Sequence, residues 1–211
     1  INEEKIYITG NTVIDALKSV IKEDYKFEDD SLNKIDFKNK KVVLLTTHRR
    51  ENWGKPMEDI FLAMTDLLNE NKEVEVIFPM HKNPSIRELA KNSFKGYEER
   101  VHLIEPLEYV DFTNLMNKAY LIMTDSGGIQ EEAPALGKPV LVLRTETERP
   151  EAVKAGTVKI AGVNRENIFK MGLELLENEE SYKAMAHAAN PYGDGNACVK
   201  ILDEIFKKFS K

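Results

Sequence analysis

From Lys40 onward, short apolar runs alternate with segments of helical periodicity, and this alternation constrains the fold more than any other feature of the sequence. The apolar runs have the length of strands and occupy residues 42–46, 74–78, 101–104, 121–123, 139–143 and 157–160. The helical segments occupy residues 56–68, 83–90, 112–116, 128 onward, 167–176, 181–188 and 197–209. Strands that alternate with helices connect through right-handed crossovers and form a parallel sheet. The sequence therefore predicts an α/β fold with a doubly wound, Rossmann-like parallel sheet.

Residues 1–39 fit this alternation less well. Residues 6–8 predict a short strand, and the apolar spacing from Val13 to Ile21 predicts a helix that begins at Thr12. Residues 22–39 are charged and show no clear periodicity, so they are interpreted as a linker or loop. The chain opens on Ile1 rather than Met, and we therefore expect it to be part of a longer protein.

The stretch from Tyr120 to Glu151 contains the strongest candidate for a binding site. A predicted strand runs into Thr124-Asp125-Ser126-Gly127-Gly128, and a helix is predicted to open at Gly128 or Ile129. A helix start offers free backbone N–H groups and a positive dipole end to an anion, and glycines allow a phosphate to approach the backbone closely. A turn and a helix cap at Ser126 would explain the same residues without a ligand. Two nearby acids, Glu131 and Glu132, and residues 147–151 favour a site.

Polar loops follow the other predicted strands, at the sheet edge where such folds bind their ligands. His48 and Arg49 open the loop after the first strand; they could contact a phosphate or form a solvated loop with an internal Arg–Glu pair. His81 follows the second strand and could simply make a structural hydrogen bond. After the third strand, Leu107 and Phe112 could meet a nucleobase, although Phe112 also has the spacing of a core residue.

Composition and motifs exclude several classes of function. The formal net charge of −6 argues against a nucleic-acid or membrane-surface partner. Cys198 is the only cysteine, so neither an internal disulfide nor a cysteine metal cluster can form, and the acids lack metal-binding spacing. No apolar run reaches the length of a membrane span, and no signal peptide precedes the first element, so we expect a cytoplasmic protein. No dinucleotide fingerprint follows the first strand and no P-loop motif occurs, so we expect neither cofactor nor metal.

Five motifs together resemble the UDP-N-acetylglucosamine 2-epimerase family of the non-hydrolysing type. They are HRREN at 48–52, HKNP at 81–84, DSGGIQEEAPALGKPVLVLR at 125–144, TERPEAV at 147–153 and NPYGDGNA at 190–197. The resemblance runs from about Gly10 to the C-terminus and covers the C-terminal half of the family's protein. It implies one half of a two-domain GT-B architecture. Residues 1–39 would be a helix and loop leading from a missing N-terminal domain, 40–189 the Rossmann-like UDP-binding domain, and 190–211 a C-terminal crossing helix.

The resemblance also implies roles for individual residues. Phe112 would stack on uracil, the Leu107 backbone would meet the base edge, and Glu132 would accept hydrogen bonds from the ribose. The diphosphate would be held by Ser126, Gly127, Gly128 and Arg149 together with His48. His48 would be catalytic, since it would stabilise or protonate the departing diphosphate. Arg49 and His81 match positions that contact an allosteric UDP-GlcNAc in bacterial members.

The implied reaction interconverts UDP-GlcNAc and UDP-ManNAc without NAD or metal. UDP is eliminated to give a 2-acetamidoglucal and is then added back after reprotonation on the other face. The fragment alone would be inactive, because carboxylates for proton transfer come mostly from the missing half; a homodimer is the family expectation. Three alternatives are a hydrolysing 2-epimerase, a GT-B glycosyltransferase that needs an acceptor, and a nucleotide-sugar binding or regulatory module without catalysis.

Overall fold

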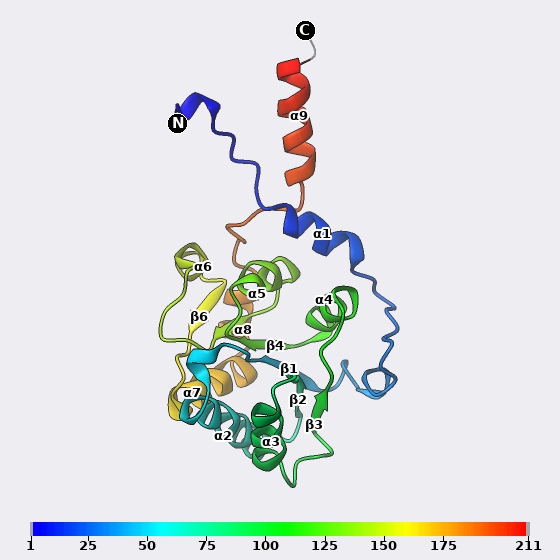
Figure 1. Ribbon diagram of the computed structural model, residues 1–211, viewed down its shortest axis with the longest axis vertical. Coiled ribbons are helices and arrows are strands. Elements are labelled where there is room, and N and C mark those ends of the chain that lie inside the picture. Colours follow the sequence, from blue (N-terminus) through cyan, green and yellow to red (C-terminus); the bar gives the residue numbers. More distant parts are fainter. Residues whose placement is uncertain (1, 210–211) are drawn as a thin grey trace.

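Six parallel strands form one sheet in the computed structural model, which describes residues 2–209 (Figure 1). The strands are β1 (Lys41–Thr46), β2 (Val74–Pro79), β3 (Val101–Ile104), β4 (Leu121–Thr124), β5 (Val140–Val142) and β6 (Val158–Ile160). Their order in the sheet is β3-β2-β1-β4-β5-β6. The chain therefore winds outward in one direction from β1 and, after β3, returns to the other side of β1 with β4. This reversal of direction between β1 and β4 is the switch point at which doubly wound sheets bind ligands.

Helices connect the strands and cover both faces of the sheet (Figure 1). They are α1 (Thr12–Val20), α2 (Lys55–Glu70), α3 (Pro84–Ser93), α4 (Tyr109–Lys118), α5 (Gly127–Glu132), α6 (Pro150–Ala155), α7 (Arg165–Glu177), α8 (Glu179–Ala186) and α9 (Ala197–Phe209). A 3₁₀ turn, Ala133–Leu136, continues directly from α5. The prediction of a doubly wound α/β fold is confirmed.

The apolar strands supply side chains to two separate cores. Val43 and Leu45 of β1 face a cluster built with α2, α3, α7 and α8, whereas Val42 and Leu44 face a cluster built with α1, α4, α5 and α6. Successive residues of a strand point to opposite faces, so a strand that is buried on both faces is apolar throughout. This explains why the interiors of β1, β4 and β5 are apolar, whereas β2, β3 and β6 each carry one polar residue that is only partly buried, Glu75, His102 and Lys159.

Four details differ from the sequence-based expectations. Residues 6–8 do not form a strand, because no strand of the described chain lies beside them, and Ile8 is 96% exposed. The linker at 22–39 is more than a loop, since Phe27 and Leu32 are buried in the second core and Leu32–Lys34 forms a 3₁₀ turn. Helix α6 was not predicted, and α5 begins at Gly127, one residue earlier than expected.

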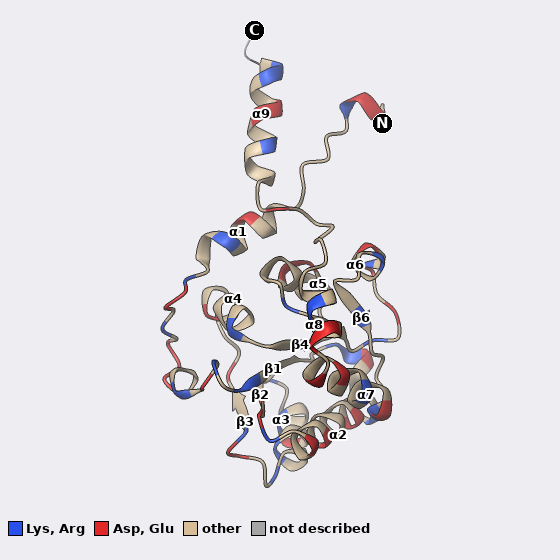
Figure 2. Cartoon of the chain, turned by 180° about the vertical axis from the view of Figure 1, so that it is seen from behind, with Lys and Arg blue, Asp and Glu red and all other residues tan. Residues whose placement is uncertain are grey.

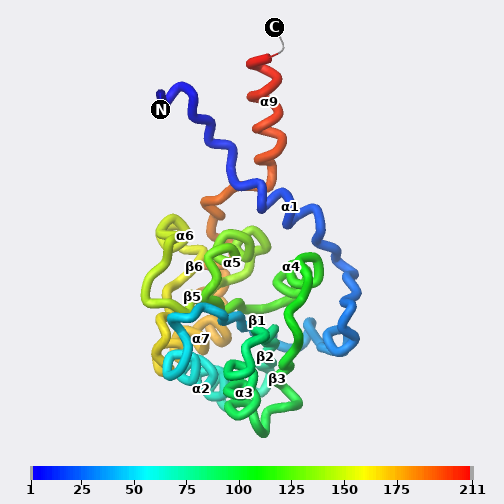
Figure 3. Tube along the Cα trace, viewed as in Figure 1, coloured from blue at the N-terminus to red at the C-terminus, as the bar shows by residue number. Residues whose placement is uncertain are grey.

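The N-terminal segment and α9 extend away from the sheet domain on the same side (Figures 1 and 3). Helix α9 carries exposed apolar side chains; Figure 2 shows narrow charged bands on an otherwise uncharged helix. The most exposed of these side chains are Val199, Leu202, Phe206 and Phe209. A hollow lies between α9 and the N-terminal segment, lined by Tyr7 and Thr9 on one side and by Ile205 and Phe209 on the other. Within residues 2–209, the helices are too short or too polar to cross a membrane.

Candidate active site at the β1–β4 seam

The carboxyl ends of β1 and β4 lie side by side and start the two loops that build the site. Thr46 of β1 is in register with Thr124 of β4, and their hydroxyl groups are 2.6 Å apart. The Thr124 hydroxyl also accepts a hydrogen bond from the backbone N–H of Ser126 at 3.0 Å. The loop that begins at Thr47 and the turn that begins at Asp125 are thereby fixed to each other where they leave the sheet.

Asp125 joins these two loops through its buried carboxylate. The residue is 0% exposed, and the carboxylate accepts hydrogen bonds from the Thr47 hydroxyl, the backbone N–H groups of His48 and Arg49, and the side-chain amide of Asn52. The donor distances lie between 2.9 and 3.0 Å. Burial alone would raise the pKa of Asp125, but the hydrogen bonds from His48 and Arg49 outweigh burial and lower it. Asp125 is therefore an ionised anchor for the whole loop after β1.

His48 is paired with Asp125 on one side and exposed on the other. Its Nδ1 lies 3.2 Å from Asp125 Oδ1, while 52% of its side chain is exposed. The hydrogen bond to Asp125 raises the pKa of His48 above its usual value of 6.5, against the opposing effects of burial and of Arg49. Because Nδ1 is hydrogen-bonded to Asp125, Nε2 is the nitrogen that can donate a proton to a ligand at the mouth of the site.

The turn after Asp125 carries the groups predicted to hold phosphate. Ser126 occupies the N-cap position of α5, but its hydroxyl makes no capping hydrogen bond in the described chain, so of the two roles open to this hydroxyl, contact with a ligand remains available. A Cβ atom built on Gly127 would lie 3.8 Å from Nη2 of Arg149 and 4.0 Å from Nη2 of Arg49. Two guanidinium groups from distant loops therefore converge over the same glycine.

Each of these arginines is held by its other nitrogens. Arg49 Nε donates to the backbone oxygen of Asp125 at 2.8 Å, and its Nη1 lies 3.5 Å from Glu148 Oε1. Arg149 Nε is bonded to Glu131, and its Nη1 donates to the backbone oxygen of Glu148 at 3.2 Å. Both Nη2 groups remain directed over Gly127. Paired guanidinium groups above a backbone turn suit an anion with several oxygens.

A different environment surrounds Glu132 at the end of α5. Burial, together with the neighbouring charge of Glu131, raises the pKa of Glu132 to about 7. Within residues 2–209, Glu132 makes no side-chain hydrogen bond or ion pair. Burial raises the pKa of Tyr109 at the start of α4, and the charge of Glu132 raises that pKa further. A half-buried carboxylate without a partner is an acceptor that a polar ligand can satisfy.

The loop from β3 to α4 completes this side of the site. Leu107 lies in the loop and Phe112 in the first turn of α4; both are half-buried and contact the second core. The spacing of Phe112 predicted a core residue or a stacking surface, and its partial burial fits either. Tyr109 stands between them with 43% of its side chain exposed.

Several residues of the site could not be assigned from the sequence. Asp125 was interpreted only as a turn residue, and Asn52, Arg144 and Glu148 received no role. Arg144 is 6% exposed and contacts Glu51 at 3.0 Å and Glu148 by a short ion pair. Arg144 thereby holds the acid that contacts Arg49. A polar or charged residue just after a buried strand is the signal that could have identified Asp125 and Arg144, whereas Asn52 and Glu148 lie further along their loops.

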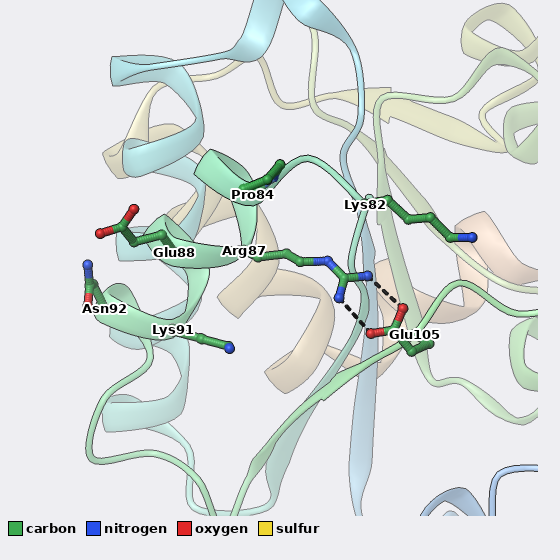
Figure 4. Close-up of a pocket in the computed structure, with 7 residues that line it drawn as sticks. All are labelled: Lys82, Pro84, Arg87, Glu88, Lys91, Asn92 and Glu105. Carbon is green, nitrogen blue, oxygen red and sulfur yellow. Dashed lines mark hydrogen bonds and ion pairs between the residues drawn. The ribbon is translucent and has the colours of Figure 1, made fainter.

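His81 and Arg49 do not contact each other by a hydrogen bond or ion pair in the described chain. His81 Nδ1 accepts a hydrogen bond from the backbone N–H of Asn83 at 3.1 Å. Beside His81 is a surface pocket lined by Lys82, Pro84, Arg87, Glu88, Lys91, Asn92 and Glu105 (Figure 4). Both terminal nitrogens of Arg87 donate to Glu105 at 2.6 Å, which directs this guanidinium away from an added anion.

The fold and the site define a Rossmann-like α/β protein with two guanidinium groups above a glycine turn at its switch point, a place where such proteins hold phosphate-bearing ligands. No group of three or more His, Cys, Asp or Glu side chains between residues 2 and 209 is arranged to hold a metal ion. The chain belongs to the UDP-N-acetylglucosamine 2-epimerase family, whose model matches residues 1–206.

Individual relatives agree with this assignment. The UDP-N-acetylglucosamine 2-epimerase of Bacillus subtilis is 50% identical over 202 residues, which cover 96% of this chain and 52% of that protein. S. aureus MnaA, in a co-structure with UDP, has a TM-score of 0.89 at 47% identity. The match covers 99% of this chain and 56% of the MnaA chain. The Neisseria meningitidis UDP-GlcNAc 2-epimerase bound to UDP-GlcNAc has a TM-score of 0.84 at 44% identity. The match covers 98% of this chain and 57% of the N. meningitidis chain.

The chain spans about half the length of the curated relatives it matches. The predicted fold, one Rossmann-like half of a GT-B architecture, is confirmed by these structures.

Proposed function

We propose that this chain is the UDP-sugar-binding half of a UDP-GlcNAc 2-epimerase, an isomerase that interconverts UDP-GlcNAc and UDP-ManNAc. The convergence of Arg49 and Arg149 on Gly127, beside the free Ser126 hydroxyl, is the observation that carries the proposal. A diphosphate on the Ser126–Gly128 turn would meet both guanidinium groups and the backbone N–H groups of the turn. The co-structures of relatives with UDP and UDP-GlcNAc support the choice of ligand.

The uridine would extend from this cradle toward α4. Glu132 lies at the far end of α5 from the cradle, and its partnerless carboxylate would accept hydrogen bonds from the ribose hydroxyls. Leu107 and Phe112 would then bound the uracil, with the backbone of Leu107 at the base edge and the ring of Phe112 on the base face.

His48 would serve the departing diphosphate. Its raised pKa favours the imidazolium, which can donate the proton on Nε2 to a diphosphate oxygen as the bond from the sugar C1 to oxygen breaks. The electrons of that bond leave with UDP, while the proton removed from C2 is taken by a base outside this chain. The glucal formed in this way is reprotonated on its other face, and UDP is added back with return of the proton to His48.

The base and the rest of the substrate cleft would come from the remaining half of the protein. We propose that residues 1–39 and 190–211 connect the sheet domain (40–189) to that half and that the apolar face of α9 packs on it. The exposure of Leu202, Phe206 and Phe209 supports this assignment, since an isolated domain gains nothing from such a surface. The chain alone is expected to bind UDP without epimerase activity.

Calorimetric titration of the chain with UDP, and with ADP as the control, tests the proposal. We expect UDP to bind and ADP to bind much more weakly, because the cradle is common to both ligands but the base subsite is not. Equal binding of UDP and ADP would support the phosphate cradle but show that the site does not recognise uridine. Binding of neither by a chain that melts cooperatively would overturn the proposal.

Assays with the other half present would separate the remaining alternatives. Release of free ManNAc and UDP would indicate a hydrolysing epimerase, and UDP release that depends on an acceptor would indicate a glycosyltransferase. UDP binding without any turnover would indicate a regulatory module.

Replacing Glu132 with Gln should weaken UDP binding and remove part of its pH dependence. Glu132 has its pKa raised to about 7, so its carboxylate accepts hydrogen bonds from ribose above that pH and is protonated below it. Wild-type affinity is therefore expected to fall about tenfold from pH 8 to pH 6, beyond the fall caused by the titrating phosphate itself. In the Glu132→Gln variant, UDP affinity should change with pH only as far as the titration of the phosphate requires.

Pyrophosphate is the control ligand for Glu132, because it lacks a ribose. Glu132→Gln and Glu132→Ala should leave pyrophosphate affinity within about twofold of wild type, whereas the loss of a charge-assisted hydrogen bond weakens UDP about tenfold. Equal losses for UDP and pyrophosphate would show that Glu132 does not contact the ribose. The ligand-free Glu132→Gln chain should also melt higher than wild type above pH 7, because burial of the ionised carboxylate is avoided.

A further inference from the structure

Arg149 is held over the phosphate cradle by an ion pair with Glu131. The Nε atom of Arg149 is bonded to Glu131 Oε1, and only 12% of the Glu131 side chain is exposed. The neighbouring Nη2, on the same edge of the guanidinium, lies over Gly127. Glu131 therefore fixes the orientation in which Arg149 meets the cradle. An arginine loses considerable rotamer freedom in such an arrangement, and a partner that orders it beforehand reduces the cost of ligand binding.

Glu131 is itself held by the segment that precedes α1. Its second oxygen, Oε2, accepts a hydrogen bond from Asn11 Nδ2 at 2.5 Å. The backbone oxygen of Glu131 accepts one from Asn190 Nδ2 at 3.0 Å. Two segments far apart in the sequence thus converge on a single residue of α5.

These two segments also cross each other at this place. The backbone N–H of Asn11 donates to the oxygen of Tyr192 at 2.8 Å, and a Cβ atom on Gly10 would lie 3.5 Å from Gly193 Cα. Gly10 and Gly193 have φ values of 96° and 131°, which L side chains rarely adopt, so glycine permits both the close approach and the conformation. We call residues 9–11 and 190–193 the crossing point.

The crossing point is joined to both projecting elements. Asn11 caps α1 by accepting from the backbone N–H of Val13 at 3.0 Å. Asp15 of α1 accepts from the backbone N–H groups of Ala197 and Cys198 at 3.1 and 2.9 Å, which caps α9. Helix α9 and the N-terminal segment (Figure 3) are therefore linked to Glu131 through α1 and Asn11.

We propose that Glu131 is a positioning residue that ties Arg149 to the crossing point, so that the affinity of the cradle for a diphosphate depends on how the two chain ends are held. The proposal rests on the proposed function, since it takes a diphosphate as the ligand of Arg149. Glu131 touches no ligand in this arrangement; its effect reaches the phosphate only through Arg149. Asn11 is one step further away and contributes through Glu131 alone.

Simple electrostatics and positioning predict opposite effects of removing the Glu131 charge. Loss of a negative charge beside an anion site should strengthen anion binding. Loss of the partner that orders Arg149 should weaken it. We expect Glu131→Gln to weaken binding of pyrophosphate and UDP about tenfold, the change that follows loss of one charge-assisted hydrogen bond. Glu151→Gln removes a neighbouring acid that makes no side-chain hydrogen bond in the described chain, and it should leave affinity unchanged or slightly higher.

Asn11→Ser provides the second variant. Serine caps a helix as well as asparagine, so α1 is preserved, but the donor to Glu131 is lost without any change of charge. We expect pyrophosphate affinity to fall about threefold to tenfold in this variant. In an Arg149→Ala background, Asn11→Ser should have no further effect on pyrophosphate, because the route through Arg149 is already broken.

The titrations use the chain of residues 1–211 at pH 8.5, with pyrophosphate, UDP and uridine as ligands. At that pH Glu132 is ionised whether or not Glu131 is charged, so the influence of Glu131 on the pKa of Glu132 does not enter. Uridine affinity should stay within about twofold of wild type in every variant, because uridine does not reach the cradle. Equal loss of uridine and pyrophosphate would indicate general disruption and overturn the proposal.

Two further outcomes would also overturn it while leaving the proposed function intact. One is tighter pyrophosphate binding by Glu131→Gln, which would make Glu131 a competitor for Arg149. The other is a full effect of Asn11→Ser in the Arg149→Ala background, which would show a route that avoids Arg149. Failure of the wild-type chain to bind both UDP and pyrophosphate would instead reject the proposed function, and this inference with it.

Discussion

Replacement of Asp125 with Ala is expected to lower the free energy of unfolding by about 3–5 kcal/mol, the cost of breaking a buried ionic interaction by removing one partner. The substitution leaves the Thr47 hydroxyl, two backbone N–H groups and the Asn52 amide without their acceptor in a site that is closed to water. His48 also loses its partner. Urea denaturation of the wild-type and variant chains measures the difference.

Asp111→Ala is the matched control, because Asp111 is also a buried aspartate. It is 5% exposed and accepts one side-chain hydrogen bond, from the Tyr25 hydroxyl. Its loss should cost about 1–3 kcal/mol, the range for one buried donor left without an acceptor. If Asp125→Ala were no more destabilising than Asp111→Ala, Asp125 would not be the anchor of the loop after β1.

The pH dependence of the Asp125 effect has a definite sign. The pKa of Asp125 is lowered below its usual value of 3.8, so its ionised form contributes stability above that pH. The contribution disappears as the pH falls through the lowered pKa. The difference between wild type and Asp125→Ala should therefore shrink in solution more acidic than that pKa, and it should also shrink as the pH rises through the raised pKa of His48, because the paired imidazolium then loses its proton.

Replacement of His48 with Ala is expected to lower epimerase turnover by about two to four powers of ten, the usual contribution of general acid catalysis. The measurement needs a complete active site, for example a chimaera in which the N-terminal half of the B. subtilis relative precedes this chain. UDP affinity should fall much less than turnover, because the two arginines and the Ser126–Gly128 turn remain in place. Wild-type turnover in the variant would exclude His48 as the acid.

The pH profile and a second histidine serve as controls for this prediction. Since the acid must be protonated and Asp125 raises the pKa of His48, turnover should decline as the pH rises through a value above 6.5. The Asp125→Asn chimaera should show this decline at lower pH, because the raising interaction is weakened. His102 lies in β3 and pairs with Glu75 at 2.9 Å, away from the seam, so His102→Gln should keep turnover close to wild type.

The fold could be predicted from the sequence because each element carries its own pattern. The strands are mostly apolar and the longer helices have one apolar face, and both properties depend on nearby residues only. Residues 6–8 show the limit of this reasoning, since they have strand-forming side chains but no neighbouring strand to bond with. Helix α6 was missed because it has only six residues and starts within the motif TERPEAV.

The site was predictable as a location but not as a set of contacts. Ser126, Gly127 and His48 could be found because they follow buried strands. The role of Asp125 depends on partners that are 73 to 78 residues away, and no local pattern reveals them. The pKa of Glu132 likewise arises from burial beneath neighbouring elements, and the free Ser126 hydroxyl from a turn geometry that sequence does not specify.

The strand order implies that the site forms late in folding. β1 to β3 join one another in sequence order, as do β4 to β6, and only the pairing of β1 with β4 connects the two sets. A chain emerging from the ribosome can assemble the first three strands early, yet it has no cradle until Arg149 has emerged and the two sets have docked. A nucleotide can bind only after that docking step, so it stabilises the docked protein and not the separate sets of strands. A bound nucleotide should therefore prolong the lifetime of the folded protein by slowing its unfolding, while the rate of folding stays the same.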